Sequence, residues 1–165
     1  MSRTRHPVLW VHGKESGPMG TKFHALVDGQ LAVHAPDLRG MDLSERLEAL
    51  VPLVERLRPV IVGSSLGGIS ALLAAIWVNV RLPGIVLCAP ALAYEWANDV
   101  PIERMAPPKG TPVSIIHGSN DVVIPLELSR RYVSVHTCCE LTVVPDDHRL
   151  SQSSKIIVDR ASRFA

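Results

Sequence analysis

The sequence predicts an α/β fold, a three-layer α/β/α sandwich around a mostly parallel sheet of about six strands. Apolar runs of strand length recur along the chain, and several are continuous rather than alternating, as expected of strands that are covered on both faces. Segments with the apolar spacing of helices lie between these runs. Such alternation is typical of βαβ units and a parallel sheet.

The expected strands lie at 7–11, 31–35, 59–63, 84–89, 112–117 and 140–144. Right-handed crossovers between parallel strands place the intervening helices on both faces of the sheet. The length of 165 residues, with 47% hydrophobic and 20% charged residues, fits one globular domain that spans 1–165.

A first helix is expected at 42–57, because Asp42 and Glu45 have the spacing of a capping box at its start. Its apolar stripe consists of Leu43, Leu47, Leu50, Val54 and Leu57. Pro52 lies inside this segment and is expected to kink or split the helix, since proline lacks the backbone N–H.

Three more helices are expected further along the chain. Residues 66–80 are apolar nearly all round, so this helix should be the most buried one. Pro125 suits the first turn of a helix over 126–136. A helix over 151–164 has its apolar stripe at Ile157, Ala161 and Phe164.

The charge and cysteine content limit the partners and the compartment. A net charge of +1 gives no electrostatic reason to expect nucleic acid or an anionic membrane surface as a partner. Cys138 and Cys139 are adjacent and only one other cysteine is present, which is not a disulfide framework. The first residues lack the apolar core of a signal peptide, so we expect a cytoplasmic protein. The oligomeric state is not predicted.

Residues 60–78 contain no charge and are about long enough to cross a bilayer, which makes a membrane span the alternative to a buried strand and helix. Three glycines and three serines in the first part of this stretch favour a strand, a tight turn and a buried helix. We therefore expect no insertion into a membrane.

Residues 63–67 read Gly-Ser-Ser-Leu-Gly and match the pattern G-x-S-x-G between an expected strand and an expected helix. This context is that of a nucleophile elbow, a sharp turn that exposes the central side chain and leaves no room for side chains at the flanking glycines. The central residue is Ser65, which makes it the candidate nucleophile. Ser64 is expected to face the scaffold.

A serine hydroxyl needs a base to accept its proton, and that base needs an acid to orient it. Asp121 follows the expected strand at 112–117, and His148 follows the strand at 140–144. Because parallel strands end at the same edge of a sheet, both residues should lie on the edge where Ser65 emerges. The order Ser, Asp, His is the one found with this type of turn.

Other aspartates and histidines are weaker candidates for the acid and the base. Asp146 and Asp147 are possible acids, but they adjoin His148 and would struggle to reach its far ring nitrogen. Structural or surface roles are expected for His6, His24, His34, His117 and His136. The histidines and cysteines show no metal-ligand spacing, so we expect no metal.

The negative oxygen of a tetrahedral intermediate needs two hydrogen-bond donors. One should be the backbone N–H of Leu66, which follows the nucleophile at the start of a helix. The other should come from the loop after the first strand, where the sequence reads His-Gly-Lys. We assign it to the backbone N–H of Lys14, with that of Gly13 as the alternative.

These motifs occur in one order over most of the chain, and the sequence resembles the α/β-hydrolase superfamily. It is most similar to small members with minimal lids, such as YqiA-like esterases and short serine thioesterases. The matching segments are 12–22, 36–40, 63–68, 117–125 and 146–150. The resemblance implies strand order 2-1-3-4-5-6, a Ser65, Asp121 and His148 triad, hydrolysis through an acyl-enzyme, and no cofactor.

The segment 91–111 is expected to form a short cap over the site. Candidate side chains for an apolar acyl-binding wall are Met19, Tyr94, Trp96, Met105 and Ile124. A short cap favours small to medium acyl esters and thioesters, and an inward Lys14 would favour acidic ones.

Two other functions remain open. An aminopeptidase or amidase would need a carboxylate near the site, for which Glu15, Glu95 and Glu103 are candidates. A binding protein without turnover would be indicated by a displaced Asp121 or His148.

Overall fold

The computed structural model describes residues 6–92 and 100–165, which form a six-stranded sheet in the order β2-β1-β3-β4-β5-β6. Every neighbouring pair in this sheet is parallel. The strands are β1 (Val8–Val11), β2 (Val33–His34), β3 (Val60–Ser64), β4 (Ile85–Cys88), β5 (Val113–Gly118) and β6 (Cys139–Val144). The sheet and its order confirm the sequence prediction.

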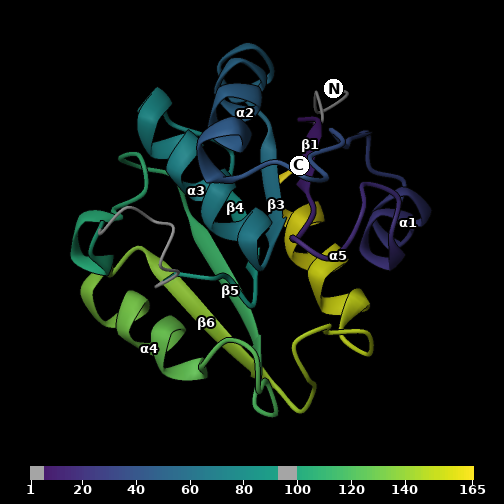
Figure 1. Ribbon diagram of the computed structural model, residues 1–165, viewed down its shortest axis with the longest axis vertical. Helices are drawn as coiled ribbons and strands as arrows, with labels where there is room; N and C mark the ends of the chain where they lie inside the picture. The colour runs from purple at the N-terminus through teal and green to yellow at the C-terminus, as the bar shows by residue number, and fades with distance from the viewer. Residues whose placement is uncertain (1–5, 93–99) are drawn as a thin grey trace.

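Helices cover both faces of the sheet and complete the three layers (Figure 1). They are α1 (Thr21–Asp28), α2 (Leu43–Leu57), α3 (Leu66–Val78), α4 (Leu126–Val135) and α5 (Ser154–Phe164), with a short 3₁₀ turn η1 (Ile102–Arg104). Helices α2, α3 and α4 share one apolar core with the sheet, whereas α1 and α5 share the other.

The central strands are continuous apolar runs because their alternate side chains enter the two cores. In β1, Leu9 packs in the core of α2, α3 and α4, while Trp10 packs in that of α1 and α5. Ile61 and Val62 of β3 divide in the same way. No helix among the described residues is long and apolar enough to span a membrane, and the stretch 60–78 forms β3 and α3 instead.

Helix α2 begins with the predicted capping box. The Oδ1 atom of Asp42 accepts the Glu45 N–H at 2.9 Å, and Glu45 Oε2 accepts the Asp42 N–H at 2.8 Å. Pro52 does not split the helix, contrary to one expectation, because it lies within a continuous helix on an exposed face. The carbonyl of Glu48, which a proline leaves without a helical partner, is on that exposed side and can bond to water.

Helix α1 was not predicted from the sequence. Leu26 is buried, but Thr21, His24, Val27 and Asp28 are exposed, so its apolar stripe is narrow. Its N-cap residue is Gly20, which has no side chain to cap the helix. Short helices with neither a cap nor a wide stripe give little signal in a sequence.

All six strands run in the same direction, so their carboxyl ends meet at one edge of the sheet. This edge lies toward the lower end of Figure 1, where the loops after β5 and β6 meet. The turn after β3 lies on the same edge. Open α/β sheets bind their ligands at this edge.

Candidate active site

Ser65 occupies a strained turn between β3 and α3. Its φ of 54° and ψ of −120° lie in a region that residues with a side chain rarely adopt. The surrounding backbone holds this conformation: the Ser65 N–H donates to the Cys88 carbonyl, and the Ser65 carbonyl accepts the N–H groups of Gly68, Ile69 and Ala91. The turn leaves the Ser65 side chain at the end of the strand, half-buried.

Two glycines of the motif are required by close backbone contacts. A Cβ atom on Gly67 would lie 2.2 Å from the Val11 carbonyl oxygen, so α3 could not approach the end of β1. A Cβ atom on Gly63 would lie 2.7 Å from the Gly67 carbonyl oxygen. The G-x-S-x-G pattern therefore has a steric basis in this chain.

His148 lies between Ser65 and Asp121. Its Nε2 atom is 3.1 Å from Ser65 Oγ, and its Nδ1 atom is 2.8 Å from Asp121 Oδ2. The three side chains come from the turn after β3 and the loops after β5 and β6. His148 therefore bonds to Ser65 rather than to Ser64, which ends β3 and pairs with Cys88.

The Asp121 carboxylate is fully buried and accepts several hydrogen bonds. Its Oδ1 atom accepts the N–H groups of Val123 and Ile124, each at 2.8 Å. Burial alone would raise the pKa of Asp121, but these N–H groups and His148 outweigh it and lower that pKa. The ionised carboxylate can only accept, so the His148 proton sits on Nδ1 and Nε2 offers its lone pair to the Ser65 hydroxyl.

His117 also contacts Asp121, a contact that was not predicted from the sequence. Its Nε2 atom lies 3.1 Å from Asp121 Oδ2 and 3.0 Å from the Ile124 carbonyl oxygen, so Nε2 faces two acceptors and carries a proton. Its Nδ1 atom lies 2.8 Å from Ser129 Oγ. Burial lowers the pKa of His117, which favours the neutral ring. The sequence carried no specific signal for this contact, because a spacing of four residues indicates neighbours in a helix, whereas these residues lie in β5 and the loop after it.

The loops that hold Asp121 and His148 pack directly on each other at Gly118. A Cβ atom on Gly118 would lie 2.2 Å from the Asp146 carbonyl oxygen. That oxygen accepts the Asn120 N–H at 3.0 Å, which ties the two loops together. The missing side chain at Gly118 therefore allows the acid and the base to meet.

The neighbouring carboxylates bond within their own loop. Asp146 accepts hydrogen bonds from the Gln152 N–H at 2.9 Å and from Ser153 Oγ at 2.8 Å. Asp147 accepts the Arg149 N–H at 2.8 Å. Both therefore hold the shape of the loop around His148, while Asp121 approaches its Nδ1 atom.

Both expected oxyanion donors border the cavity beside Ser65. Leu66 opens α3, so its N–H belongs to the first turn of the helix, where backbone N–H groups lack helical partners. Gly13 lies next to the nucleophile, since a Cβ atom on it would be 3.6 Å from Ser65 Cβ. Lys14 follows it and lines the same cavity.

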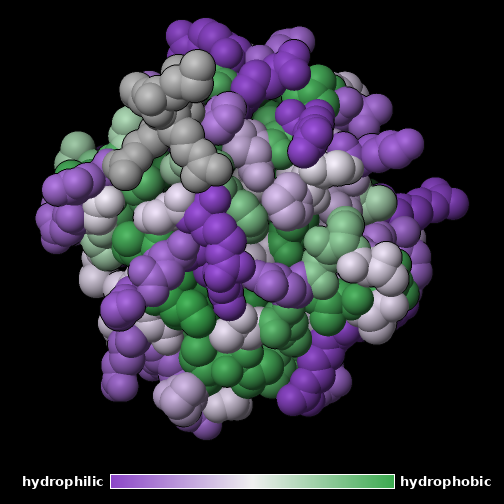
Figure 2. Space-filling model, turned by 180° about the vertical axis from the view of Figure 1, so that it is seen from behind, coloured by the Kyte–Doolittle hydropathy of each residue, from purple (hydrophilic) through white to green (hydrophobic). Residues whose placement is uncertain are grey.

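The cavity at Ser65 has a volume of about 790 Å³. It is lined by residues 13–17, 20–22, 64–66, 123–124 and 148–151, together with Trp10 and Ser154. Seen from behind, the surface mixes polar and apolar side chains, and apolar ones gather toward the lower end of the molecule (Figure 2). Val122 and Val123 are exposed in the loop after β5.

The expected acyl-binding wall is only partly found. Ile124 lines the cavity. Met105 does not, because it is fully buried in the core shared by α2, α3 and α4, where its carbonyl accepts the Tyr132 hydroxyl at 2.9 Å. Met19 is 70% exposed and is not a lining residue. Tyr94 and Trp96 lie outside the described residues.

The described part of the expected cap packs elsewhere. His136 of the segment after α4 contacts the Ile102 carbonyl at 2.7 Å, and Ile102 is buried in the core. Of the described residues 91–92 and 100–111, none lines this cavity. Residues 13–17 and 20–22 border the cavity, because the chain after β1 turns along the carboxyl edge before α1.

Charged residues are unevenly distributed around the cavity. Lys14, Lys22 and Arg149 line it together with one carboxylate, Glu15. Glu103 instead pairs with Arg131 at the surface, and Glu95 lies outside the described residues. Within 6–92 and 100–165, no three His, Cys, Asp or Glu side chains are grouped so as to hold a metal ion.

The fold agrees with a match of the sequence to a known protein family. The sequence model of the alpha/beta hydrolase family matches residues 8–150, and the chain belongs to this family. The closer resemblance to YqiA-like esterases and short thioesterases stays a prediction. A search of curated proteins finds no match for this chain.

Solved structures share the fold over nearly the whole chain. A hydrolase of the alpha/beta superfamily from Xanthomonas campestris pv. campestris is 24% identical, with a TM-score of 0.77 and 96% of each chain covered. Est1E from Butyrivibrio proteoclasticus is 18% identical, with a TM-score of 0.81 and coverage of 99% and 88%. The monoacylglycerol lipase of Paleococcus ferrophilus is 18% identical, with a TM-score of 0.72 and coverage of 98% and 97%.

Proposed function

We propose that this protein is a serine hydrolase that cleaves small to medium acyl esters and thioesters through an acyl-enzyme intermediate. The observation that carries the proposal is the position of His148, whose two ring nitrogens lie 3.1 Å from Ser65 Oγ and 2.8 Å from Asp121 Oδ2. This geometry is that of a nucleophile, a general base and an orienting acid.

In the proposed reaction, His148 Nε2 takes the Ser65 proton as Oγ attacks the substrate carbonyl carbon. The negative oxygen that forms is stabilised by the backbone N–H groups of Leu66 and Lys14. His148 then donates its proton to the leaving alkoxide or thiolate, and the acyl-enzyme forms. Water repeats the sequence, and the carboxylic acid leaves. The mechanism uses no cofactor.

The size and lining of the cavity support the substrate class. A volume of about 790 Å³ suits a ligand of small to medium size. Val123 and Ile124 offer apolar surface for an acyl chain, whereas Lys14, Lys22 and Arg149 offer positive charge for acidic substrates. Among proteins of similar fold, Est1E binds ferulic acid, and the protein from Paleococcus ferrophilus is a monoacylglycerol lipase.

Labelling with a fluorophosphonate probe tests the proposal. The wild-type protein and Ser64→Ala should be labelled covalently, and Ser65→Ala should not, because only Ser65 Oγ contacts the base. Folding of each variant is checked by circular dichroism. Folded wild-type protein that is not labelled would contradict the catalytic proposal and favour a binding protein without turnover.

A second candidate is an aminopeptidase or amidase, which Glu15 favours because this residue lines the cavity and its carboxylate could hold a free amine. Hydrolysis rates should be compared for phenyl acetate, methyl ferulate, a monoacylglycerol, an acyl thioester, a hemisuccinate ester and aminoacyl anilides. Higher kcat/KM for the anilides than for the esters, lost in Glu15→Gln, would replace the first candidate with the second.

A further inference from the structure

Arg46 of α2 is a buried cation beside the candidate oxyanion loop. Its exposed fraction is 1%, and it lies on the inner face of the helix, where Leu50 also packs. No carboxylate of residues 6–92 or 100–165 forms an ion pair with it. Burying a guanidinium without a counter-ion is costly unless its N–H groups find other acceptors.

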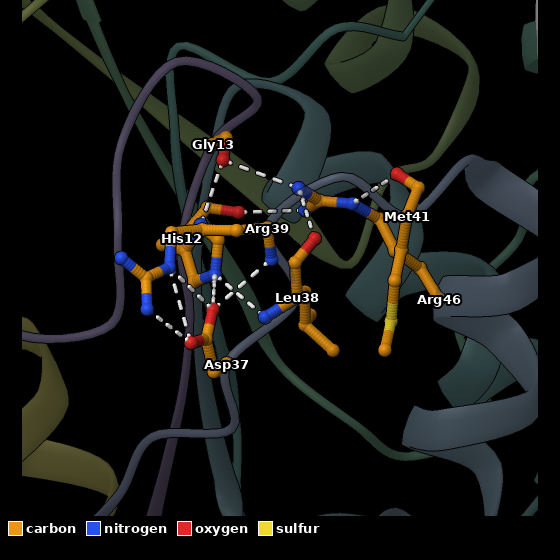
Figure 3. Close-up of polar contacts among 7 residues, drawn as sticks. All are labelled: His12, Gly13, Asp37, Leu38, Arg39, Met41 and Arg46. Carbon is orange, nitrogen blue, oxygen red and sulfur yellow. Dashed lines mark hydrogen bonds and ion pairs between the residues drawn. The ribbon is translucent and has the colours of Figure 1, made fainter.

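Four backbone carbonyls supply those acceptors (Figure 3). Nη1 donates to the His12 carbonyl at 2.7 Å, and Nη2 donates to the Gly13 carbonyl at 3.2 Å. Nη2 and Nε also donate to the Leu38 and Met41 carbonyls, each at 3.3 Å. Arg46 thereby joins the loop after β1 to the loop before α2.

The bonds from Arg46 to the His12 and Gly13 carbonyls also fix the directions of the N–H groups in the same two peptide bonds, which belong to Gly13 and Lys14. In a trans peptide the N–H points opposite to the C=O, and no peptide bond among the described residues is cis. The His12 and Gly13 carbonyls point to Arg46, so the N–H groups of Gly13 and Lys14 point away from it. Gly13 and Lys14 both line the cavity together with Ser65.

His12 holds the same loop from a second direction. The Leu38 N–H donates to its Nε2 atom at 2.9 Å, so Nε2 is unprotonated and the ring proton sits on Nδ1. Nδ1 then donates to the Gly13 carbonyl at 2.7 Å. The Gly13 carbonyl thus accepts from two side chains, which polarises the peptide and strengthens the Lys14 N–H as a donor.

We propose that Arg46 is a positioning residue for the oxyanion site, which aims the backbone N–H groups of residues 13 and 14 at the tetrahedral intermediate through its bonds to the His12 and Gly13 carbonyls. This inference rests on the proposed function. It assigns a role in transition-state stabilisation to a side chain that does not contact the substrate.

The test compares Arg46→Met, which removes the donors at similar volume, with Arg46→Lys and with Arg56→Met, a change of an exposed arginine on the same helix. For phenyl acetate, kcat of Arg46→Met should fall at least about tenfold, toward the roughly 10²–10³-fold loss of one oxyanion donor, with KM little changed. Arg46→Lys should recover part of kcat, and Arg56→Met should match the wild type.

Two ligands separate positioning from a general structural defect. Phenylboronic acid forms a tetrahedral adduct with a serine hydroxyl, whereas benzoate resembles the product. In Arg46→Met the affinity for phenylboronic acid should fall in proportion to kcat/KM, while the affinity for benzoate is kept. An unchanged kcat, or an equal loss for both ligands, would overturn the inference.

Two further measurements decide the question if Arg46→Met does not fold. In ¹⁵N-labelled wild-type protein, the amide resonance of Gly13 or Lys14 should move downfield when phenylboronic acid binds, and amides that do not move would overturn the inference. A folded Arg46→Lys with wild-type kcat would overturn it as well. If the wild type is active but these results are negative, only the role of Arg46 is overturned. If the wild type neither hydrolyses phenyl acetate nor binds phenylboronic acid, the proposed function is overturned as well.

Discussion

The Nε2 atom of His117 lies 3.1 Å from Asp121 Oδ2, the oxygen that also contacts Nδ1 of His148. One carboxylate oxygen therefore faces two histidines, one buried and one at the cavity. Burial lowers the pKa of His117 and so favours its neutral ring, and Ser129 holds its Nδ1 side, so His117 can fix the carboxylate without competing for the proton on His148.

His117→Asn should lower kcat more than His117→Gln. Asparagine can replace the contact of Nδ1 with Ser129, but only glutamine reaches the position of Nε2 beside Asp121. A hydrogen bond to a charged group is worth about 1.5–3 kcal/mol, which corresponds to a loss of about tenfold or more in kcat for His117→Asn. Ester hydrolysis measures this difference, with the exposed His34→Gln as control. Equal kcat values in the two His117 variants would contradict it.

The free energy of unfolding should fall as the pH drops below about 6.5. Burial is the main cause that lowers the pKa of both His12 and His117 from 6.5. Below that value the unfolded chain takes up protons that the folded protein does not, so stability present at neutral pH is lost toward the lower folded-state pKa, by up to about 1.4 kcal/mol per pH unit for each histidine.

Urea unfolding at pH 7.5 and 5.5 measures this pH effect. His117→Gln should show a smaller difference between the two pH values than the wild type, because glutamine does not titrate. The exposed His34→Gln is the control and should keep the wild-type difference. A wild-type protein that is equally stable at both pH values would refute the prediction.

Gly118→Ala should reduce both stability and activity. Its Cβ atom would lie 2.2 Å from the Asp146 backbone oxygen, so the two loops must move apart. Overpacking of this kind costs about 1–3 kcal/mol, and a shift of about 1 Å between reacting groups can cost about 100-fold in rate. Thermal unfolding and kcat measure the two effects. The exposed change Ser44→Ala on α2, away from the cavity, is the control and should behave like the wild type.

The sheet, four of the helices and the meeting of Ser65, Asp121 and His148 were predictable because each depends on a local pattern. Continuous apolar runs indicate buried parallel strands, and residues that follow such strands share one edge. The contact of His148 with both partners then follows from topology. The capping box of Asp42 and Glu45 is equally local and was found as predicted.

What was missed depends on contacts between distant segments. Arg46 lies on the buried face of α2 three residues after Leu43 and four before Leu50, but the loop carbonyls that make its burial possible come from 12–13 and 38–41. The segment 91–111 was expected to cap the site because it follows β4, and this cap stays a prediction. In its described part, Ile102 and Met105 pack in the core shared by α2, α3 and α4, which the local sequence does not indicate.

The backbone conformation of Ser65 is one that serine rarely adopts. Hydrogen bonds to neighbouring segments hold it, from the Ser65 N–H to the Cys88 carbonyl and to the Ser65 carbonyl from N–H groups of α3 and of the segment after β4. A local loosening of β3 against β4 would let this residue relax while most of the sheet is still formed. Chemical reactivity at Ser65 is therefore a sensitive gauge of whether the middle of the sheet is intact.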